Sequence, residues 1–280
     1  MTILELQKQI VAILEAGGCE TPAFDAVCLL EDIGEIGRGQ VPCSYERSIS
    51  TTLEKAVLNA AKRRAGGEPL QYLLGTWDFL DLTLEVGDGV LIPRPETELL
   101  CQLTAEYLQK CPRKLVYDLC AGSGCVGLGI ASLCREASVT SVELSDKAFV
   151  YLQRNVLRYP DLKIKAVQAD ILTQHDLFSG TVDAIVSNPP YIPTRDLGFL
   201  QREVQHEPRM ALDGDEDGYR FYRAIAERWL PKLSQDGFVA VEVGIGQAQT
   251  VADLFCQHGL TQTEVHTDFA GIDRVVIGKR

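Results

Sequence analysis

From residue 115 onward, the sequence alternates between short apolar segments and amphipathic segments of helical period. The segments rich in Val and Ile predict buried strands, and the amphipathic segments predict the helices that connect them. Such alternation favours a doubly wound, mostly parallel sheet with right-handed crossovers. The last two predicted strands lie too close together in the chain for a crossover helix, so we expect the final strand to run antiparallel. The predicted strands cover residues 115–119, 138–143, 163–168, 182–187, 238–243, 261–267 and 273–278. The predicted helices cover residues 96–109, 123–135, 146–158, 218–233 and 246–257.

The first 75 residues have a different pattern, in which apolar side chains recur at helical spacing. Amphipathic helices are predicted over residues 3–16, 22–37 and 50–65, and Gly66-Gly67 stops the last of them. The N-terminal part of the chain is therefore expected to form a small, all-helical unit.

The pattern changes again between the helical unit and the α/β region. Residues 80–86 alternate polar and apolar side chains, residues 87–89 form a Gly-Asp-Gly turn, and residues 90–92 return, which predicts a β-hairpin. The expected organisation is a helical domain at 1–75, a hairpin linker at 76–95 and an α/β domain at 96–280.

Acidic residues follow three consecutive predicted strands, at the edge where doubly wound sheets bind ligands. Asp118 precedes a turn that contains Gly122 and Gly124, whose missing side chains let the backbone approach a ligand. Glu143 closes the second strand, where a carboxylate can bind both hydroxyls of a ribose, and Asp170 closes the third. A carboxylate at the mouth of the loop would repel a pyrophosphate. A sulfonium that carries an amine, S-adenosylmethionine, suits this charge better than NAD.

The tetrapeptide Asn188-Pro189-Pro190-Tyr191 follows the predicted strand 182–187. Proline cannot donate a ladder hydrogen bond, so the strand ends there and Asn188 is held extended at its carboxyl end. The Asn188 side chain offers a donor and an acceptor, the Pro189 carbonyl offers a second acceptor, and the Tyr191 ring can stack on a planar group. These groups suit a planar nitrogen nucleophile such as an amide or an exocyclic base amine. Asn-Pro-Pro is also good turn chemistry, so the tetrapeptide alone leaves a structural role open.

Composition excludes several classes of function. The net charge of −12 opposes extended contact with a phosphate backbone, so direct nucleic-acid binding is not expected. The nine cysteines lack CxxC spacing and the four histidines form no ligand pattern, so neither a disulfide framework nor a metal site is predicted. No apolar run approaches the roughly 18–20 residues that span a membrane, and the N-terminus is amphipathic rather than a signal peptide. A cytoplasmic location is expected.

Together these motifs resemble class I S-adenosylmethionine-dependent methyltransferases, and specifically the HemK/PrmC family of protein-(glutamine-N5) methyltransferases, which modify peptide-chain release factors. The resemblance covers nearly the whole chain. The tetrapeptide NPPY is shared with DNA adenine methyltransferases, whereas the segment IPRPETE and the helical N-terminal domain are more specific. Besides the loop after Asp118 and NPPY, the matching motifs are PLQYLxG at 69–75, Phe79 in WDF, LIPRPETE at 91–98, EPxxAL at 207–212, DG at 217–218 and DRVV at 273–276.

The resemblance implies a class I methyltransferase fold with an antiparallel last strand. It implies transfer of a methyl group from S-adenosylmethionine to N5 of the glutamine in the Gly-Gly-Gln motif of class 1 release factors, with S-adenosylhomocysteine as product. The helical domain is then expected to recognise the protein substrate.

The resemblance also assigns expected roles to residues. Asn188, Pro189 and Tyr191 are the expected catalytic residues. The expected cofactor-binding residues are Asp118, Ala121, Gly122, Gly124, Glu143, Asp170 and Asn188. The expected substrate-binding residues are Asn188, Pro189, Pro190, Tyr191, Phe79 and Arg94.

The glycine-rich loop departs from the family pattern at two positions. The family loop usually reads D-L-G-T-G-S-G, whereas this chain has Cys120 and Ala121 at the third and fourth positions. The loop is therefore expected to differ in detail. Cys120 is expected to be a packed thiol, because methyl transfer from a sulfonium needs no nucleophilic cysteine.

Three other functions compete with this hypothesis. An adenine-N6 DNA methyltransferase shares NPPY, but it needs a basic face and a target-recognition domain. A methyltransferase that acts on a ribosomal-protein glutamine shares the amide chemistry and stays open. A nucleotide-binding scaffold without activity conflicts with intact Asn188 and Tyr191.

Overall fold

A computed structural model describes residues 1–280, which form two compact units. The first unit contains residues 1–76 and 201–206, and the second contains residues 77–200 and 207–280. This division differs from the predicted one in two places. The hairpin belongs to the larger unit instead of forming a separate linker, and a short segment from the second half of the chain packs with the helices. No helix is both long and apolar enough to cross a lipid bilayer.

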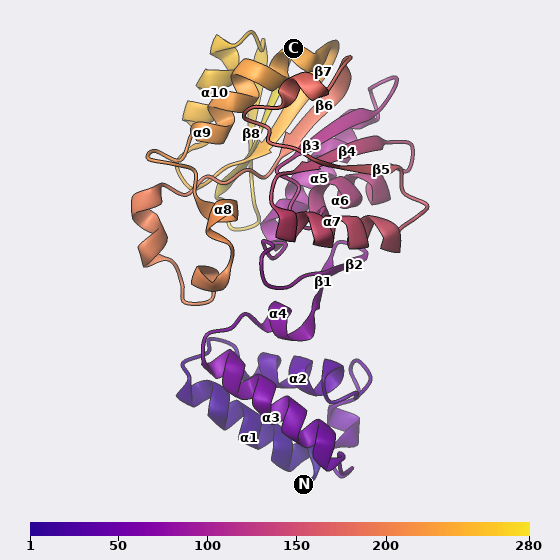
Figure 1. Ribbon diagram of the computed structural model, residues 1–280, viewed down its shortest axis with the longest axis vertical. Helices are drawn as coiled ribbons and strands as arrows, with labels where there is room; N and C mark the ends of the chain where they lie inside the picture. Colours follow the sequence, from indigo (N-terminus) through magenta and orange to yellow (C-terminus); the bar gives the residue numbers. More distant parts are fainter. The chain divides into compact units, whose positions relative to one another are not determined.

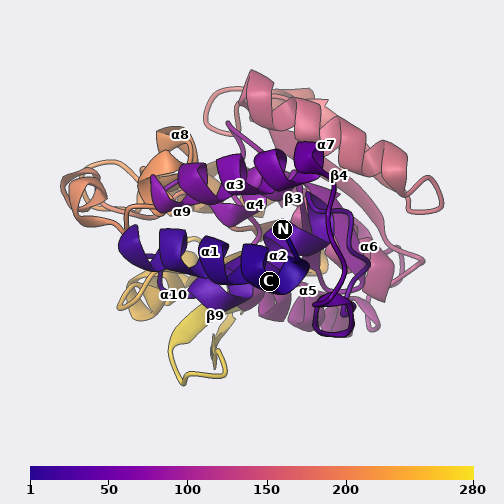
Figure 2. The same ribbon diagram turned by 90° about the horizontal axis from the view of Figure 1, so that it is seen from below.

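The smaller unit is built from helices, as predicted (Figure 2). Thr2 begins the first helix with a capping box, in which its hydroxyl accepts from the Glu5 backbone and the Glu5 side chain accepts from the Thr2 backbone. Both α2 and α3 pack against α1, and buried leucine and isoleucine side chains fill the space between them. The elements are α1 (Ile3–Ala16), α2 (Pro22–Asp32), the 3-10 turn η1 (Pro42–Ser44), α3 (Thr51–Ala65) and α4 (Leu70–Leu74).

The second helix ends at Asp32, five residues before the predicted end at residue 37. Only glycine fits the turn at residue 34, because a Cβ atom there would lie 2.4 Å from the Leu30 carbonyl oxygen. The next residue, Glu35, has a φ of 56°, which no continuing α-helix allows. The run 33–37 therefore forms a turn, although its apolar residues fit a helical period.

Residues 201–206 are held on the helical unit by charged contacts. The Arg64 guanidinium is buried between Asp25, at 2.7 Å, and Glu203, at 2.6 Å. Arg202 donates to the Gly66 carbonyl oxygen at 2.6 Å. A buried cation with two carboxylate partners is costly to separate, so this segment is an integral part of the unit.

The larger unit has a seven-stranded sheet in the order β5-β4-β3-β6-β7-β9-β8 (Figure 1). The five neighbouring strands β5, β4, β3, β6 and β7 are parallel to one another. Strand β9 runs antiparallel to both β7 and β8, which confirms the predicted antiparallel last strand. Chain order reverses between β3 and β6, which are neighbours in the sheet. The strands are β3 (Leu115–Leu119), β4 (Ser138–Glu143), β5 (Ile164–Gln168), β6 (Val182–Ser187), β7 (Leu233–Glu242), β8 (Gln262–Thr267) and β9 (Asp273–Lys279).

Helices cover both faces of this sheet and enclose two apolar cores. Buried side chains of α5 and α6 pack on one face, and those of α9, the π-helix after it, and α10 pack on the other. The elements on or beside the sheet are α5 (Pro95–Leu108), α6 (Cys125–Leu133), α7 (Asp146–Arg158), α9 (Arg220–Ala224), the π-helix η5 (Ile225–Trp229) and α10 (Ala248–Gln257). The short elements between them are η2 (His175–Leu177), η3 (Thr194–Phe199), η4 (Val204–His206), α8 (Arg209–Leu212) and η6 (Leu230–Lys232).

The predicted helix at 218–233 is broken into three pieces. Helix α9 passes into the π-helix at Ile225, and a 3-10 turn follows at Leu230. Pro231 lacks the N–H group that a continuing helix would need, so the helix ends there. The seventh strand then begins at Leu233, earlier than the predicted residue 238.

The hairpin is present, but its strands differ from the predicted ones. They are β1 (Thr76–Phe79) and β2 (Leu82–Glu85), so the turn falls at Leu80-Asp81 and residues 90–92 form no strand. The side chains of Leu82 and Leu84 still point into the core, as their alternation predicts. The turn is possible because Leu80 takes a φ of 51°.

Candidate functional site

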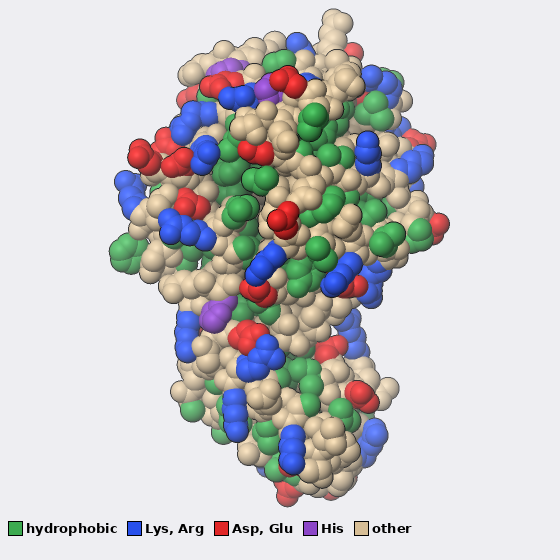
Figure 3. All heavy atoms as spheres, viewed as in Figure 1, with side chains coloured by type: hydrophobic (Ala, Val, Ile, Leu, Met, Phe, Trp, Pro, Cys, Tyr) green, Lys and Arg blue, Asp and Glu red, His purple; other side chains and the backbone are tan.

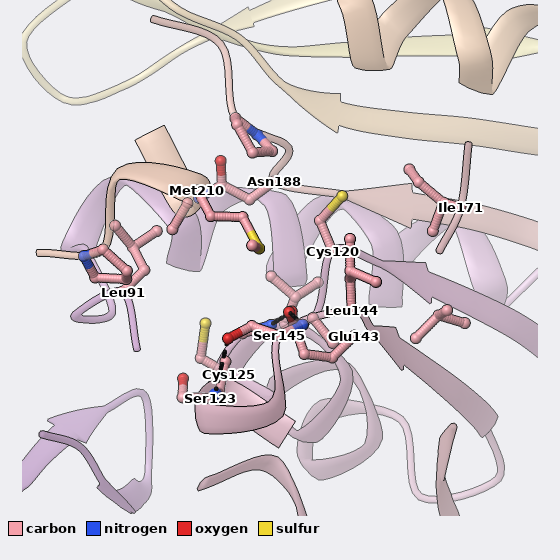
Figure 4. A pocket seen from close by; sticks show the side chains of 18 of the residues that line it. Leu91, Cys120, Ser123, Cys125, Glu143, Leu144, Ser145, Ile171, Asn188 and Met210 are labelled. Carbon is pink, nitrogen blue, oxygen red and sulfur yellow. Dashed lines mark hydrogen bonds between the residues drawn. The ribbon is translucent and has the colours of Figure 1, made fainter. Parts of the chain in front are cut away.

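A pocket opens at the carboxyl ends of β3, β4, β5 and β6, where the order of the strands reverses (Figure 4). It contains about 910 Å³ of space, with the open mouth included. This is the position at which doubly wound sheets bind ligands. The predicted site residues that line it are Arg94, Ala121, Gly122, Glu143, Asp170, Asn188 and Pro190.

Glu143 is the buried carboxylate of the pocket, at the end of β4. Its two oxygens accept from the Gly122 backbone at 2.8 Å and from the Ser145 backbone at 2.7 Å. Burial raises the pKa of Glu143, and the amide donors partly oppose that shift. Each oxygen keeps a second acceptor position, so the group can bind a pair of hydroxyls.

Asp170 follows β5 and lines the same pocket. Its carboxylate accepts from the Leu172 backbone at 2.8 Å and from the Thr173 hydroxyl at 2.8 Å, which closes a turn. The neighbouring wall, formed by Ala169 and Ile171, is apolar. A planar, mostly apolar ring system suits this wall.

Asp118 does not lie at the mouth of the loop, which corrects the prediction. It is 1% exposed and is not part of the pocket wall. Its Oδ2 atom accepts from the Ser141 hydroxyl at 2.8 Å and from the Gly127 backbone at 3.1 Å, and its Oδ1 atom has no partner. Burial raises the pKa of Asp118 to about 7. The side chain ties β4 to the start of α6 behind the loop.

The loop itself keeps a left-handed turn without the expected glycine. Cys120 has a φ of 60°, a conformation that costs a non-glycine residue roughly 1–2 kcal/mol. Its side chain packs against the apolar core and also lines the pocket, and burial raises the pKa of its thiol, which disfavours the thiolate. Gly124 does not line the pocket, and a Cβ atom there would lie 2.6 Å from the Leu152 side chain.

Asn188 points into the pocket from the end of β6 (Figure 4). Its Nδ2 atom donates to the Thr97 hydroxyl at 3.2 Å, and Thr97 in turn donates to Glu242 at 2.6 Å. Its Oδ1 atom has no partner within the chain. Pro189 is buried outside the pocket wall, and its carbonyl oxygen accepts no hydrogen bond.

Two aromatic residues that were expected to hold the substrate lie elsewhere. Phe79 is 1% exposed and belongs to the core beneath α5 and α6. Tyr191 packs against the other core, with its ring close to Gly244, and its carbonyl oxygen accepts from the Gln247 side chain at 2.9 Å. Neither ring forms part of the pocket wall. The aromatic residue that does line the pocket is Phe221.

Arg94 lines the pocket, but its guanidinium pairs with a buried carboxylate. Glu207 accepts from Arg94 and, at 3.0 Å, from the Ile92 backbone. The pair joins the segment before α5 to the segment after β6. It therefore shapes the wall of the pocket and does not present a free cation.

The sequence prediction missed Glu242, a second buried carboxylate near the site. It lies at the end of β7 and is 2% exposed, and burial raises its pKa to about 7. A single acidic residue at the end of the apolar run VAVEV was the available signal, since Glu143 ends its own strand in the same way.

Two buried carboxylates with raised pKa values, Asp118 and Glu242, predict how stability depends on pH. Because burial raises both pKa values to about 7, ionisation opposes folding, and stability should fall as pH rises from about 4 to about 7. Urea denaturation of the cofactor-free protein should give a free energy of unfolding a few kcal/mol higher near pH 5 than near pH 8. Glu242→Gln should remove roughly half of that difference. A free energy that rises over this interval would contradict the assignment.

Comparison with known proteins covers both units. Residues 5–75 match the PrmC N-terminal domain, and residues 97–207 match the methyltransferase small domain. The release factor glutamine methyltransferase of Geobacter sulfurreducens is 38% identical over 264 residues, which cover 94% of this chain and 91% of that protein. The release factor glutamine methyltransferase of Moorella thermoacetica is 34% identical over 282 residues, which cover 100% of this chain and 99% of that protein.

Solved structures agree on the fold. The hMettl16 catalytic domain matches with a TM-score of 0.60 over 79% of this chain and 81% of that chain. At 16% identity, this similarity concerns the fold alone.

Proposed function

The chain belongs to the release factor glutamine methyltransferase family, and we propose that it transfers a methyl group from S-adenosylmethionine to N5 of the glutamine in the Gly-Gly-Gln motif of class 1 peptide-chain release factors. The observation that carries this proposal is the Asn188 carboxamide, whose free oxygen faces a pocket that also contains Glu143. Methyl labelling of a purified release factor, followed by peptide mapping, tests it.

The pocket residues fit S-adenosylmethionine. Glu143 has acceptor positions left for the two ribose hydroxyls, and the apolar wall at Ala169 and Ile171 suits the adenine ring. Gly122 has a φ of 57° and open space where its Cβ would be, so the backbone can approach a ligand closely. The cofactor supplies an electrophilic methyl group on a sulfonium.

The residues of the chain then have to orient a poor nucleophile. The lone pair of an amide nitrogen is delocalised into its carbonyl, so correct placement matters more than activation. The Asn188 carboxamide oxygen lines the pocket without a partner in the chain and can accept one N–H of the glutamine amide. Pro189 is not part of the pocket wall, but its carbonyl oxygen also has no partner, and we assign the second N–H to it. Positioning of this kind is worth effective molarities on the order of 10⁵ M or more.

No strong general base is required for this reaction. As the nitrogen–methyl bond forms and the sulfur–methyl bond breaks, the nitrogen becomes positively charged and both hydrogen bonds strengthen. The protonated, methylated amide is acidic and loses its extra proton to water. Burial keeps the pKa of the nearby Tyr191 hydroxyl raised, so that group stays neutral.

Cofactor binding gives a direct prediction for Glu143. Glu143→Ala should weaken binding of S-adenosylmethionine by ~1.5–3 kcal/mol, the usual range for hydrogen bonds to a charged group. Isothermal titration calorimetry measures the change, with Glu106→Ala as an exposed control on α5. Equal affinity in wild type and Glu143→Ala would remove this residue from the ribose site.

We further propose that the helical unit recognises the protein substrate. It matches the PrmC N-terminal domain over residues 5–75 and carries none of the pocket residues. An enzyme that lacks residues 1–75 should bind cofactor and methylate a short Gly-Gly-Gln peptide, but lose methylation of the intact release factor. Residues 201–206 lose their packing partner in that variant, which could disturb the rest of the enzyme. Methylation of the short peptide is therefore the control that the active site is intact. Full activity on the intact factor would rule out a docking role.

Charge supports a protein substrate over DNA. The chain carries a net charge of −12, and acidic and basic side chains intermingle on the face seen in Figure 3 without forming a continuous basic stripe. Adenine in duplex DNA would need such a stripe to hold the backbone while the base is flipped.

A further inference from the structure

Three polar side chains from separate elements form a hydrogen-bonded chain that ends at the pocket. Asn188 Nδ2 donates to the Thr97 hydroxyl at 3.2 Å, and that hydroxyl donates to the Glu242 carboxylate at 2.6 Å. Thr97 lies in the first turn of α5, Asn188 directly follows β6, and Glu242 ends β7. Thr97 and Glu242 are 1% and 2% exposed, so water does not compete for these hydrogen bonds.

The number of available hydrogens fixes which atom donates and which accepts in both of these hydrogen bonds. An ionised carboxylate has no hydrogen to donate, and a contact of 2.6 Å is typical of a hydroxyl that donates to a charged oxygen. The one hydrogen of Thr97 is therefore used on Glu242. Thr97 can then only accept from Asn188, so the nitrogen of that carboxamide must face Thr97 and the oxygen must face away.

We propose that Thr97 and Glu242 are positioning residues that fix the Asn188 carboxamide with its oxygen toward the pocket, and so restrict the site to substrates that present N–H donors, such as a primary amide. This inference rests on the proposed function and names the residues that set its specificity. With the carboxamide reversed, its own N–H groups would meet those of the substrate, and both sets of donors would lack acceptors.

Burying a carboxylate is costly, so Glu242 is expected to have a role. Its side chain accepts the hydrogen bond from Thr97. It is not part of the pocket wall, so it acts through Thr97. The charged and titratable groups that act on the Glu242 carboxylate are Arg274 of β9, Glu96 of α5 and the hydroxyl of Tyr191. Tyr222 of α9 donates to the Glu242 backbone carbonyl at 2.9 Å.

Protonation of Glu242 should weaken its control over the orientation of the Asn188 carboxamide. A protonated carboxyl can donate to Thr97, which frees the Thr97 hydrogen to approach Asn188 and favours the reversed carboxamide. Since burial raises the pKa of Glu242 to about 7, we expect turnover to fall as pH drops below about 7.

Neutron diffraction from deuterated wild-type crystals near pH 8 tests the orientation without any assay. Deuterium should appear on Asn188 Nδ2, directed at Thr97, and on the Thr97 hydroxyl, directed at Glu242. Deuterium on the Asn188 atom that faces the pocket would overturn the inference. Because the maps need no substrate, they decide it even if the release factor proves to be the wrong substrate.

A double-mutant cycle tests the consequence for rate. With S-adenosylmethionine and a Gly-Gly-Gln peptide, Thr97→Val should lower kcat by ~10²-fold while cofactor affinity changes little. Thr97→Ser restores the hydroxyl and should recover most of that loss. In an Asn188→Ala background, Thr97→Val should cost almost nothing more, because the group it positions is gone. An equal loss of kcat in both backgrounds would show a general structural role for Thr97 and overturn the inference. Failure of the wild-type enzyme to methylate the peptide would contradict the proposed function instead.

Discussion

Replacing Asn188 by alanine is expected to lower kcat by roughly 10²–10³-fold, the usual cost of removing one hydrogen-bonding group that acts in the transition state. The side chain lines the pocket, and its free oxygen is one of two acceptors for the substrate amide. Single-turnover methylation of a Gly-Gly-Gln peptide at saturating S-adenosylmethionine measures the effect.

The affinity for the cofactor should change little in this variant. Glu143→Ala is the reciprocal control, since it should weaken cofactor binding. Near-normal turnover by Asn188→Ala would sink the mechanism, because Pro189 alone would then have to orient the substrate amide.

Changing the glutamine of the Gly-Gly-Gln motif to glutamate in the release factor should abolish methylation. A carboxylate has no N–H groups, so it would leave the Asn188 oxygen and the Pro189 carbonyl without partners. Mismatches of this kind can cost factors of ~10⁴. The change is measured by transfer of a labelled methyl group to intact factor, with an asparagine variant as a control that keeps the amide but shortens the side chain. Label that persists on the glutamate variant would show that another residue is the acceptor.

The sheet could be predicted from the sequence because its strands are continuous apolar runs with clear stops. The predicted ends of β3, β4 and β6 agree with the structure. Glu143 ends β4 and Asn188 follows β6, and both side chains line the pocket. Parallel pairing then brings these strand ends to one edge, so the site follows from the strand order.

The errors arise where tertiary packing decides. Alternation over 80–86 indicates which side chains face the core, but the turn falls at Leu80-Asp81, one strand earlier than predicted. Asp118 is the last residue but one of β3 and lies opposite Ser141, whereas Glu143 is the last residue of β4. The Asp118 side chain accepts from Gly127 of α6 and is buried there. The prediction treated both acids as lying at the edge of the sheet, but Asp118 lies inside its strand and only Glu143 reaches the edge.

Long-range partners were also invisible to sequence patterns. The hydrogen-bonded chain through Thr97 and Glu242 joins residues 145 positions apart, and the contact of Arg64 with Glu203 joins distant segments of the chain. The helical and strand periods of the sequence do not predict contacts between residues so far apart. A buried acid at the end of β7 and a buried arginine in α3 became informative only when their neighbours were known.

Mass mapping of a methylated release factor tests the central claim most directly. Purified enzyme is incubated with S-adenosylmethionine and a class 1 release factor, and the digested factor is sequenced by tandem mass spectrometry beside a sample made with Asn188→Ala enzyme. We predict one added methyl group, on the side-chain amide of the glutamine in the Gly-Gly-Gln motif, and a strongly reduced signal with the variant. A methyl group found on another residue of the factor would contradict the account, as would preferential methylation of a ribosomal protein or of DNA when either is added to the same reaction.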